Sequence, residues 1–225
     1  MTNDLMCALG LINTHITESG GALMNEQAAD AFSALQARAS AAGFQLSVVS
    51  SFRSYERQLA IFNGKWRGER PVLDDFDRAL IRQDYSEEQW LHRILRFSAL
   101  PGTSRHHWGT DIDIFDPTRI PVGESLQLIP SEYRNGGIFE DLTQWLDERI
   151  AADDCEGFFR PYDRDRGGVS EEPWHLSYEP VASALRPLVT AGNLRDLWLR
   201  EPGLRPDGYE SILPLLNELM DRYVV

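Results

Sequence analysis

The sequence predicts an α+β fold in which helices pack around a small antiparallel sheet. Several short stretches alternate apolar and polar residues as half-buried strands do, and longer stretches repeat apolar residues at helical spacing. The two kinds of segment neither alternate regularly nor separate into two halves, which disfavours a parallel βαβ arrangement. A chain of 225 residues is of single-domain size, so we expect one domain over residues 1–225.

The expected elements follow from these patterns. Residues 25–42 place Ala28, Phe32, Leu35 and Ala39 on one helical face, and Gly43 follows them. Further helices are expected after Ser54, after the capping-box sequence Ser86-Glu-Glu-Gln89, and around residues 139–150, 180–190 and 209–223. Strands are expected at residues 44–50, 110–115, 157–159 and 174–178.

The polar motifs fall within residues 44–178, which we expect to form the core of the domain. The charged segment 64–100 is interpreted as a helical elaboration that covers this core. Residues 180–225 are expected to add C-terminal helices.

The net charge of −13 argues against nucleic-acid binding and against docking on anionic lipid. No run reaches the eighteen or so apolar residues of a membrane span. The N-terminal stretch lacks a basic region and is interrupted by Asn13 and His15, so we expect a cytoplasmic protein. Cys7 and Cys155 fit free thiols in a reducing compartment. Nothing indicates an obligate protein partner.

A first polar cluster surrounds the strand at residues 110–115. Ile112 and Ile114 point to one face of that strand, and Asp111 and Asp113 point to the other. A histidine on the preceding turn, in the sequence Ser104-Arg-His-His-Trp-Gly109, can meet such an aspartate at one metal ion. The pattern thus predicts a metal site at this strand, although a capping aspartate would share the same sequence.

A second polar cluster is Glu171-Glu-Pro-Trp-His175. His175 and Ser177 occupy one strand face, while Trp174, Leu176 and Tyr178 are expected on the other. A catalytic zinc needs three protein ligands and an open position for water, and two histidines with one carboxylate supply them. A further carboxylate can then act as the base.

These clusters resemble the D-alanyl-D-alanine carboxypeptidase and L,D-carboxypeptidase family of zinc peptidases. The resemblance rests on Ser104-x-His106-x-x-Gly109-x-x-x-Asp113, on Glu172-Pro-Trp-His175 and on Ser51-Phe-Arg-Ser-Tyr-Glu-Arg-Gln58, in the family's order. The family includes D-Ala-D-Ala dipeptidases and shares its core fold with lysostaphin-type peptidases and the Hedgehog domain.

The resemblance implies a role for each matching residue. His106, Asp113 and His175 would bind one Zn²⁺ per chain, and Glu172 would be the general acid/base. Arg53, Gln58 and Ser104 would hold the terminal carboxylate of the substrate, for which the arginine fork is well suited.

The roles of several residues have alternatives. Asp111 stands where the family usually has a small residue, so it could rival Asp113 as a ligand or hydrogen-bond a ligand histidine. His107 is an alternative to His106, and Glu171 is an alternative base. The segment 160–168 also differs from the family's tyrosine-rich stretch. His15 and His92 are expected in helices outside the motifs, as structural or surface residues.

The implied activity is removal of a C-terminal D-Ala from peptidoglycan stem peptides. We expect L,D-carboxypeptidase activity on tetrapeptides in murein recycling, because a cytoplasmic enzyme that trimmed pentapeptides would damage the cell-wall supply. A D,D-carboxypeptidase or D-Ala-D-Ala dipeptidase is the alternative, and a catalytically inactive peptide-binding module is the more remote one.

Overall fold

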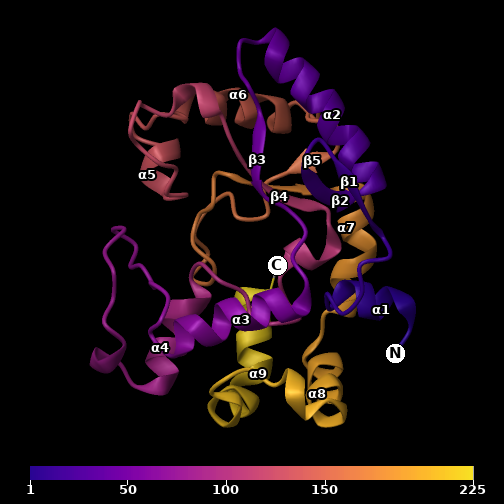
Figure 1. The fold of residues 1–225 in the computed structure, drawn as a ribbon, viewed down its shortest axis with the longest axis vertical. Helices are drawn as coiled ribbons and strands as arrows, with labels where there is room; N and C mark the ends of the chain where they lie inside the picture. Colours follow the sequence, from indigo (N-terminus) through magenta and orange to yellow (C-terminus); the bar gives the residue numbers. More distant parts are fainter. Residues whose placement is uncertain (225) are drawn as a thin grey trace.

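A four-stranded antiparallel sheet with the order β3-β4-β6-β5 lies at the centre of the fold (Figure 1). Its strands are β3 (Ser47–Ser50), β4 (Asp111–Phe115), β5 (Phe158–Phe159) and β6 (His175–Tyr178). A separate hairpin pairs β1 (Ile16–Ser19) with β2 (Ala22–Asn25). The computed structural model describes residues 1–224, and within them the expected α+β class is confirmed.

Helices surround this sheet. They are α1 (Asn3–Ala8), α2 (Glu26–Ala41), α3 (Tyr55–Trp66), α4 (Glu87–Leu95), α5 (Pro130–Tyr133), α6 (Glu140–Ala151), α7 (Glu179–Leu185), α8 (Ala191–Arg200) and α9 (Tyr209–Tyr223). Side-chain caps fix the residues at which α3 and α4 begin: Ser54 accepts from the Arg57 amide, and Ser86 and Gln89 form the expected capping box. None of the helices in residues 1–224 combines the length and apolar character that a bilayer-spanning helix requires.

The described residues form two large hydrophobic clusters and a small third one around Tyr133, Phe139 and Trp174. The first joins the apolar face of the sheet to α2 and α6, through side chains such as Ile112, Leu176 and Leu146. The second joins α1, α3, α4, α7, α8 and α9, with Phe62, Trp90, Trp198 and Leu216 among its buried members. In Figure 1, α2 and α6 lie above the sheet and α3, α4, α8 and α9 lie below it. The other face of the sheet is therefore left for polar side chains.

The helical predictions at 25–42 and 139–150 and the four strand predictions agree with the structure within a few residues. The hairpin β1–β2 and the helices α1, α5 and α8 were not predicted. His15 was expected in a helix but precedes β1, and its Nε2 atom contacts the carbonyl oxygen of His107 at 3.2 Å. Trp174 lies before β6 and packs with Tyr133 and Phe139 rather than with Leu176. Cys7 and Cys155 are buried free thiols.

Gly109 ends the short 3₁₀ turn η2 (Arg105–Trp108) and leads the chain into β4. Its φ of +68° lies in the left-handed region, which favours glycine. A Cβ at this position would stand 2.3 Å from Ile16 Cδ1 and 2.8 Å from the Asn25 nitrogen. Both the conformation and the close approach of the β1–β2 hairpin therefore require a glycine here.

We expect Gly109→Ala to lower the free energy of unfolding by about 2–4 kcal/mol, because it adds a clash to an unfavourable φ. Gly123→Ala is the matched control: Gly123 has a φ of +87°, but a Cβ there meets no atom within 4 Å. It should cost only about 1–2 kcal/mol. Urea unfolding of both variants measures the difference, and equal losses would refute the packing argument.

Candidate metal centre and active site

The register of β4 and β6 brings the two sequence motifs together. Asp113 lies directly opposite His175, and Asp111 lies opposite Ser177, so all four side chains share one face of the sheet. The Nδ1 atom of His175 is 3.1 Å from Asp113 Oδ1. Residues that are 62 positions apart in the chain thus meet through one cross-strand pair.

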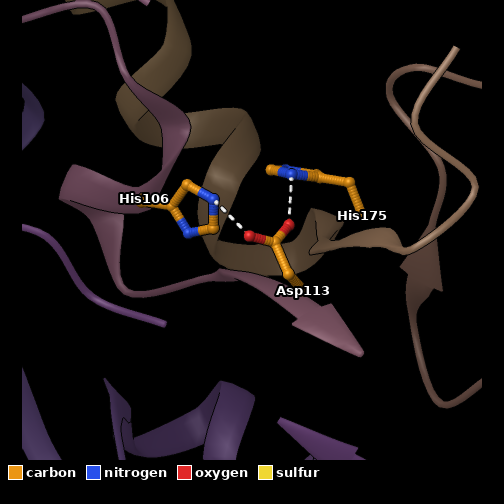
Figure 2. A group of neighbouring side chains, drawn as sticks. All are labelled: His106, Asp113 and His175. Carbon is orange, nitrogen blue, oxygen red and sulfur yellow. Dashed lines mark hydrogen bonds and ion pairs between the residues drawn. The ribbon is translucent and has the colours of Figure 1, made fainter. Parts of the chain in front are cut away.

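His106 reaches the same carboxylate from the turn η2. Its Nε2 atom is 3.4 Å from Asp113 Oδ2, and its Nδ1 atom is 3.1 Å from the carbonyl oxygen of Asp111. Because a carbonyl can only accept, Nδ1 carries the proton and the lone pair of Nε2 faces Asp113. Figure 2 shows the two imidazole rings approaching the two oxygens of Asp113 from opposite sides.

These three side chains fit a metal ion. Each offers one ligand atom, the three atoms all lie within 4.8 Å of one another, and the side chains are buried. Two imidazole nitrogens and one carboxylate oxygen form the donor set of a tetrahedral catalytic metal site with one open position. His106, Asp113 and His175 are therefore brought together in the manner that the sequence predicted.

Asp111 occupies a different place from Asp113. Its Oδ1 atom accepts from Arg105 Nε at 2.7 Å and lies 2.9 Å from His175 Nε2. Its Oδ2 atom accepts from Thr110 Oγ1 at 2.6 Å and from Ser177 Oγ at 3.0 Å. With both oxygens engaged, Asp111 orients His175 from behind instead of competing with Asp113, as carboxylates behind metal-binding histidines commonly do.

His107 also has both ring nitrogens engaged. Its Nδ1 atom is 2.6 Å from the carbonyl oxygen of Arg53, and its Nε2 atom accepts from the Gly102 amide at 3.2 Å. The ring is fully buried and stacks on Tyr55. These contacts give His107 a structural role and leave the metal position to His106.

Burial and neighbouring charges shift the pKa of each of the three candidate ligands differently. Burial would raise the pKa of Asp113, but the imidazoles of His106 and His175 outweigh it, and the pKa falls well below its usual range. Burial lowers the pKa of His106, which keeps it neutral. Burial also acts to lower the pKa of His175, but Asp111 and Asp113 outweigh this effect and raise it to about 10. A metal ion must therefore displace a proton from His175.

Glu172 stands beside this group on the loop before β6. Its Oε2 atom is 3.5 Å from His175 Nδ1. Burial, the largest cause, raises the pKa of Glu172 to about 7, against the opposing effect of the nearby His175. A carboxylate with a pKa near neutrality suits a group that both accepts and returns a proton. The alternative base, Glu171, instead pairs with Arg134 at 2.9 Å.

A cavity of about 540 Å³ opens in front of these residues. Its lining includes Glu172, Arg53 and Ser104. Arg53 donates to Gln58 Oε1 at 2.8 Å and to Ser50 Oγ at 3.1 Å. Gln58 is fully buried and also donates to the Ala99 carbonyl at 2.7 Å, so the structure shows it holding the guanidinium. Direct contact of Gln58 with substrate stays a prediction.

Two further residues belong to the site and were not predicted. Tyr162 lines the cavity and packs edge-to-face on His175, with ring centroids 5.0 Å apart. Arg105 lies between the motif residues Ser104 and His106, and its guanidinium holds Asp111 and Ser177. The position of Arg105 inside the motif was a usable signal, whereas Tyr162 falls in the segment that departs from the family pattern.

Comparison with known proteins identifies the family of this chain. The family model described as D-alanyl-D-alanine carboxypeptidase matches residues 21–181, which contain every candidate site residue. This chain belongs to that family. The family is described by D-alanyl-D-alanine carboxypeptidase activity, which makes this chain a peptidase.

Similar proteins include two uncharacterized proteins of Haemophilus influenzae. One is 37% identical over 126 residues, which cover 56% of this chain and 93% of that relative. The other is 44% identical over 90 residues, which cover 40% of this chain and 62% of that relative. Neither relative has a described activity, so the family assignment rests on the family model.

Solved structures share the fold at low identity. VanYB in complex with D-alanine-D-alanine is 22% identical, with a TM-score of 0.52 over 77% of this chain and 81% of that one. A variant of the vancomycin resistance D,D-pentapeptidase VanY in complex with Zn(II) is also 22% identical, with a TM-score of 0.50 over 78% and 89%. These likenesses establish the α+β architecture.

The role of Asp111 can be tested through metal affinity. Asp111→Asn keeps the size of the side chain and removes the charge that orients His175, so zinc affinity should fall about 10- to 100-fold. Competition with a chromophoric chelator measures the affinity. Asp116→Asn is the matched control, since Asp116 is equally buried but bonds to Thr118 and the Gln45 amide. Thermal unfolding of the metal-free variants separates lost affinity from lost fold, and an unchanged affinity in Asp111→Asn would exclude the orienting role.

Proposed function

We propose that this protein is a zinc carboxypeptidase that removes the C-terminal D-alanine from peptidoglycan stem peptides. The observation that carries the proposal is the position of Glu172, 3.5 Å from His175 and beside a three-donor metal site in one cavity with Arg53. A structural metal site would be closed by four protein ligands, often cysteines, whereas this one offers three. Family membership supports the same class of substrate.

Zinc is the proposed metal, held by His106, Asp113 and His175. When bound there, it would polarise the scissile carbonyl and lower the pKa of a water molecule. Two imidazole nitrogens and one ionised carboxylate suit zinc once His175 has released its proton, and the tautomer of His106 is already fixed by the Asp111 carbonyl.

Glu172 is the proposed general base and general acid. Its carboxylate would accept a proton from the attacking water and return it to the amine of the departing residue. The pKa of about 7 lets one group perform both transfers near neutral pH. Tyr162, packed on His175, lines the same cavity as this carboxylate.

Arg53 and Ser104 are proposed to hold the terminal carboxylate of the peptide. Arg53 is partly buried, and its hydrogen bonds go to the neutral partners Gln58 and Ser50. Its positive charge is therefore available to a ligand carboxylate, which a guanidinium can bind through two parallel hydrogen bonds. A site that needs this carboxylate releases one residue from the end of a chain.

Among the possible substrates we favour tetrapeptides, cleaved between meso-diaminopimelate and D-alanine. A location in the cytoplasm is part of this proposal, because an enzyme there that trimmed pentapeptide precursors would consume the cell-wall supply. Trimming of recovered tetrapeptides would instead serve recycling. The alternative is D,D-carboxypeptidase or D-Ala-D-Ala dipeptidase activity. An inactive binding module is disfavoured by Glu172 beside a full donor set.

The zinc-loaded protein should convert tetrapeptide to tripeptide and D-alanine, with slower or no release of D-alanine from pentapeptide. Mass spectrometry of tetrapeptide and pentapeptide muropeptides after incubation measures both reactions. Faster trimming of the pentapeptide would establish the D,D alternative, and release of intact D-Ala-D-Ala would establish the dipeptidase.

Glu172→Gln is the control for that assay. It keeps the size of the side chain but removes the base, so turnover should fall by at least ~10²-fold while zinc stays bound. Near-normal turnover by a zinc-loaded variant would place the base elsewhere.

A double comparison tests Arg53. Amidating the substrate's C-terminus, or changing Arg53→Ala, should each cost about 2–3 kcal/mol, or roughly 30- to 150-fold in kcat/KM. Because both changes remove the same charge-assisted contact, the combined loss should be little larger than either alone. Four rate measurements with zinc content checked decide this point. Additive losses would show that Arg53 does not bind the terminal carboxylate. Efficient cleavage of internal bonds would identify the protein as an endopeptidase.

A further inference from the structure

Two more cations, Lys65 and Arg70, line the same cavity as Arg53 and Glu172. Within residues 1–224, neither of their side chains forms an ion pair with a carboxylate or a hydrogen bond. Arginines elsewhere in this acidic chain commonly pair with carboxylates, as Arg67 does with Glu69 and Arg96 does with Asp165. The lining also contains the carboxylates of Asp77, Asp113 and Glu172, but none of them lies within ion-pair distance of Lys65 or Arg70, so both cations can bind a ligand carboxylate.

The backbone lets Arg70 pack against α3, the helix that carries Lys65. Gly64 lies inside α3 directly before Lys65, where a glycine costs about 1 kcal/mol relative to alanine. A Cβ at Gly64 would stand 2.9 Å from Arg70 Cδ and 3.1 Å from its Cγ. The Arg70 amide also donates to the Gly64 carbonyl at 3.0 Å. The glycine thus lets the stem of Arg70 lie against the helix beside Lys65.

Lys65 is held in an environment that disfavours its own charge. Burial, the largest cause, lowers its pKa to about 8; Glu172 opposes this shift, while Arg53 and Arg70 add to it. An anion bound beside the ammonium would relieve this cost, because an opposite charge favours the charged form. Arg70 is solvent-exposed and also lines the cavity.

We propose that Lys65 and Arg70 form a second carboxylate subsite, which binds an acidic group on the side chain of the residue before the scissile bond. The proposal rests on the carboxypeptidase function and names its substrate class: peptides with a dicarboxylic residue at that position. Apolar side chains of the cavity, such as Leu95, Phe97 and Leu128, suit the aliphatic chain that leads to the acidic group. Meso-diaminopimelate has this chemistry, whereas lysine has an amine and no second carboxylate.

Three tetrapeptides that differ only at the residue before D-alanine test the subsite. They carry meso-diaminopimelate, the same residue with its side-chain carboxylate amidated, or L-lysine. The zinc-loaded wild-type protein should cleave the free acid at least ~10-fold more efficiently, in kcat/KM, than the amide or the lysine peptide. Arg70→Gln and Lys65→Gln should each remove most of that preference and leave cleavage of the amide within about 2- to 3-fold.

Arg200→Gln is the matched control, because Arg200 is an exposed arginine of α8 outside the cavity lining. It should keep the full preference. Equal cleavage of acid and amide by the wild-type protein, or a preference that survives in both variants, overturns the subsite while the carboxypeptidase function stands. A loss in Lys65→Gln that is equal for all three peptides would show that Lys65 acts on Glu172 and not on substrate. No cleavage of any peptide would overturn the proposed function together with the subsite.

Discussion

The antiparallel pairing of β4 with β6 is the contact on which the site depends. It sets Asp113 against His175 and Asp111 against Ser177 on one face, while Ile112 and Leu176 pair on the other and enter the core. A slip of one residue would exchange the two faces and bury the carboxylates among leucines and isoleucines. The hydrophobic core thus fixes the register, and the register fixes the metal donors.

Behind those donors lies a buried ion pair between Arg105 and Asp111. Such pairs contribute little to stability, since the cost of removing two charges from water offsets their attraction. Here the pair has another use. Arg105 and Ser177 hold the carboxylate that fixes His175, so the polar network restrains the orientation of a ring that a metal would need.

The sequence predicted the structure best where residues with metal-binding chemistry lie in a stretch of alternating polar and apolar residues. The alternation of Asp111, Ile112 and Asp113 predicted both the strand and its polar face, and the histidine-containing motifs predicted the cluster that the structure assembles. The family motif favoured His106 over its neighbour His107, and the different tertiary hydrogen bonds of the two rings now separate their roles. Lys65 and Arg70 belong to no motif, because the place of Arg70 in the cavity depends on how the chain packs back against Gly64. The hairpin β1–β2 has a local signal in its sequence, because Gly20 and Gly21 at its turn both have a positive φ.

Arg53, Lys65 and Arg70 line the cavity of a chain whose net charge is −13. An acidic peptide in solution first meets the repulsive field of the whole protein, which salt screens beyond the Debye length, about 8 Å at physiological ionic strength. The attraction to Arg53, Lys65 and Arg70 acts only near contact, where counter-ions screen it less. Moderate salt therefore weakens the long-range repulsion more than it weakens the attraction to these three cations. An anionic peptide should associate faster, and not more slowly, as the ionic strength rises.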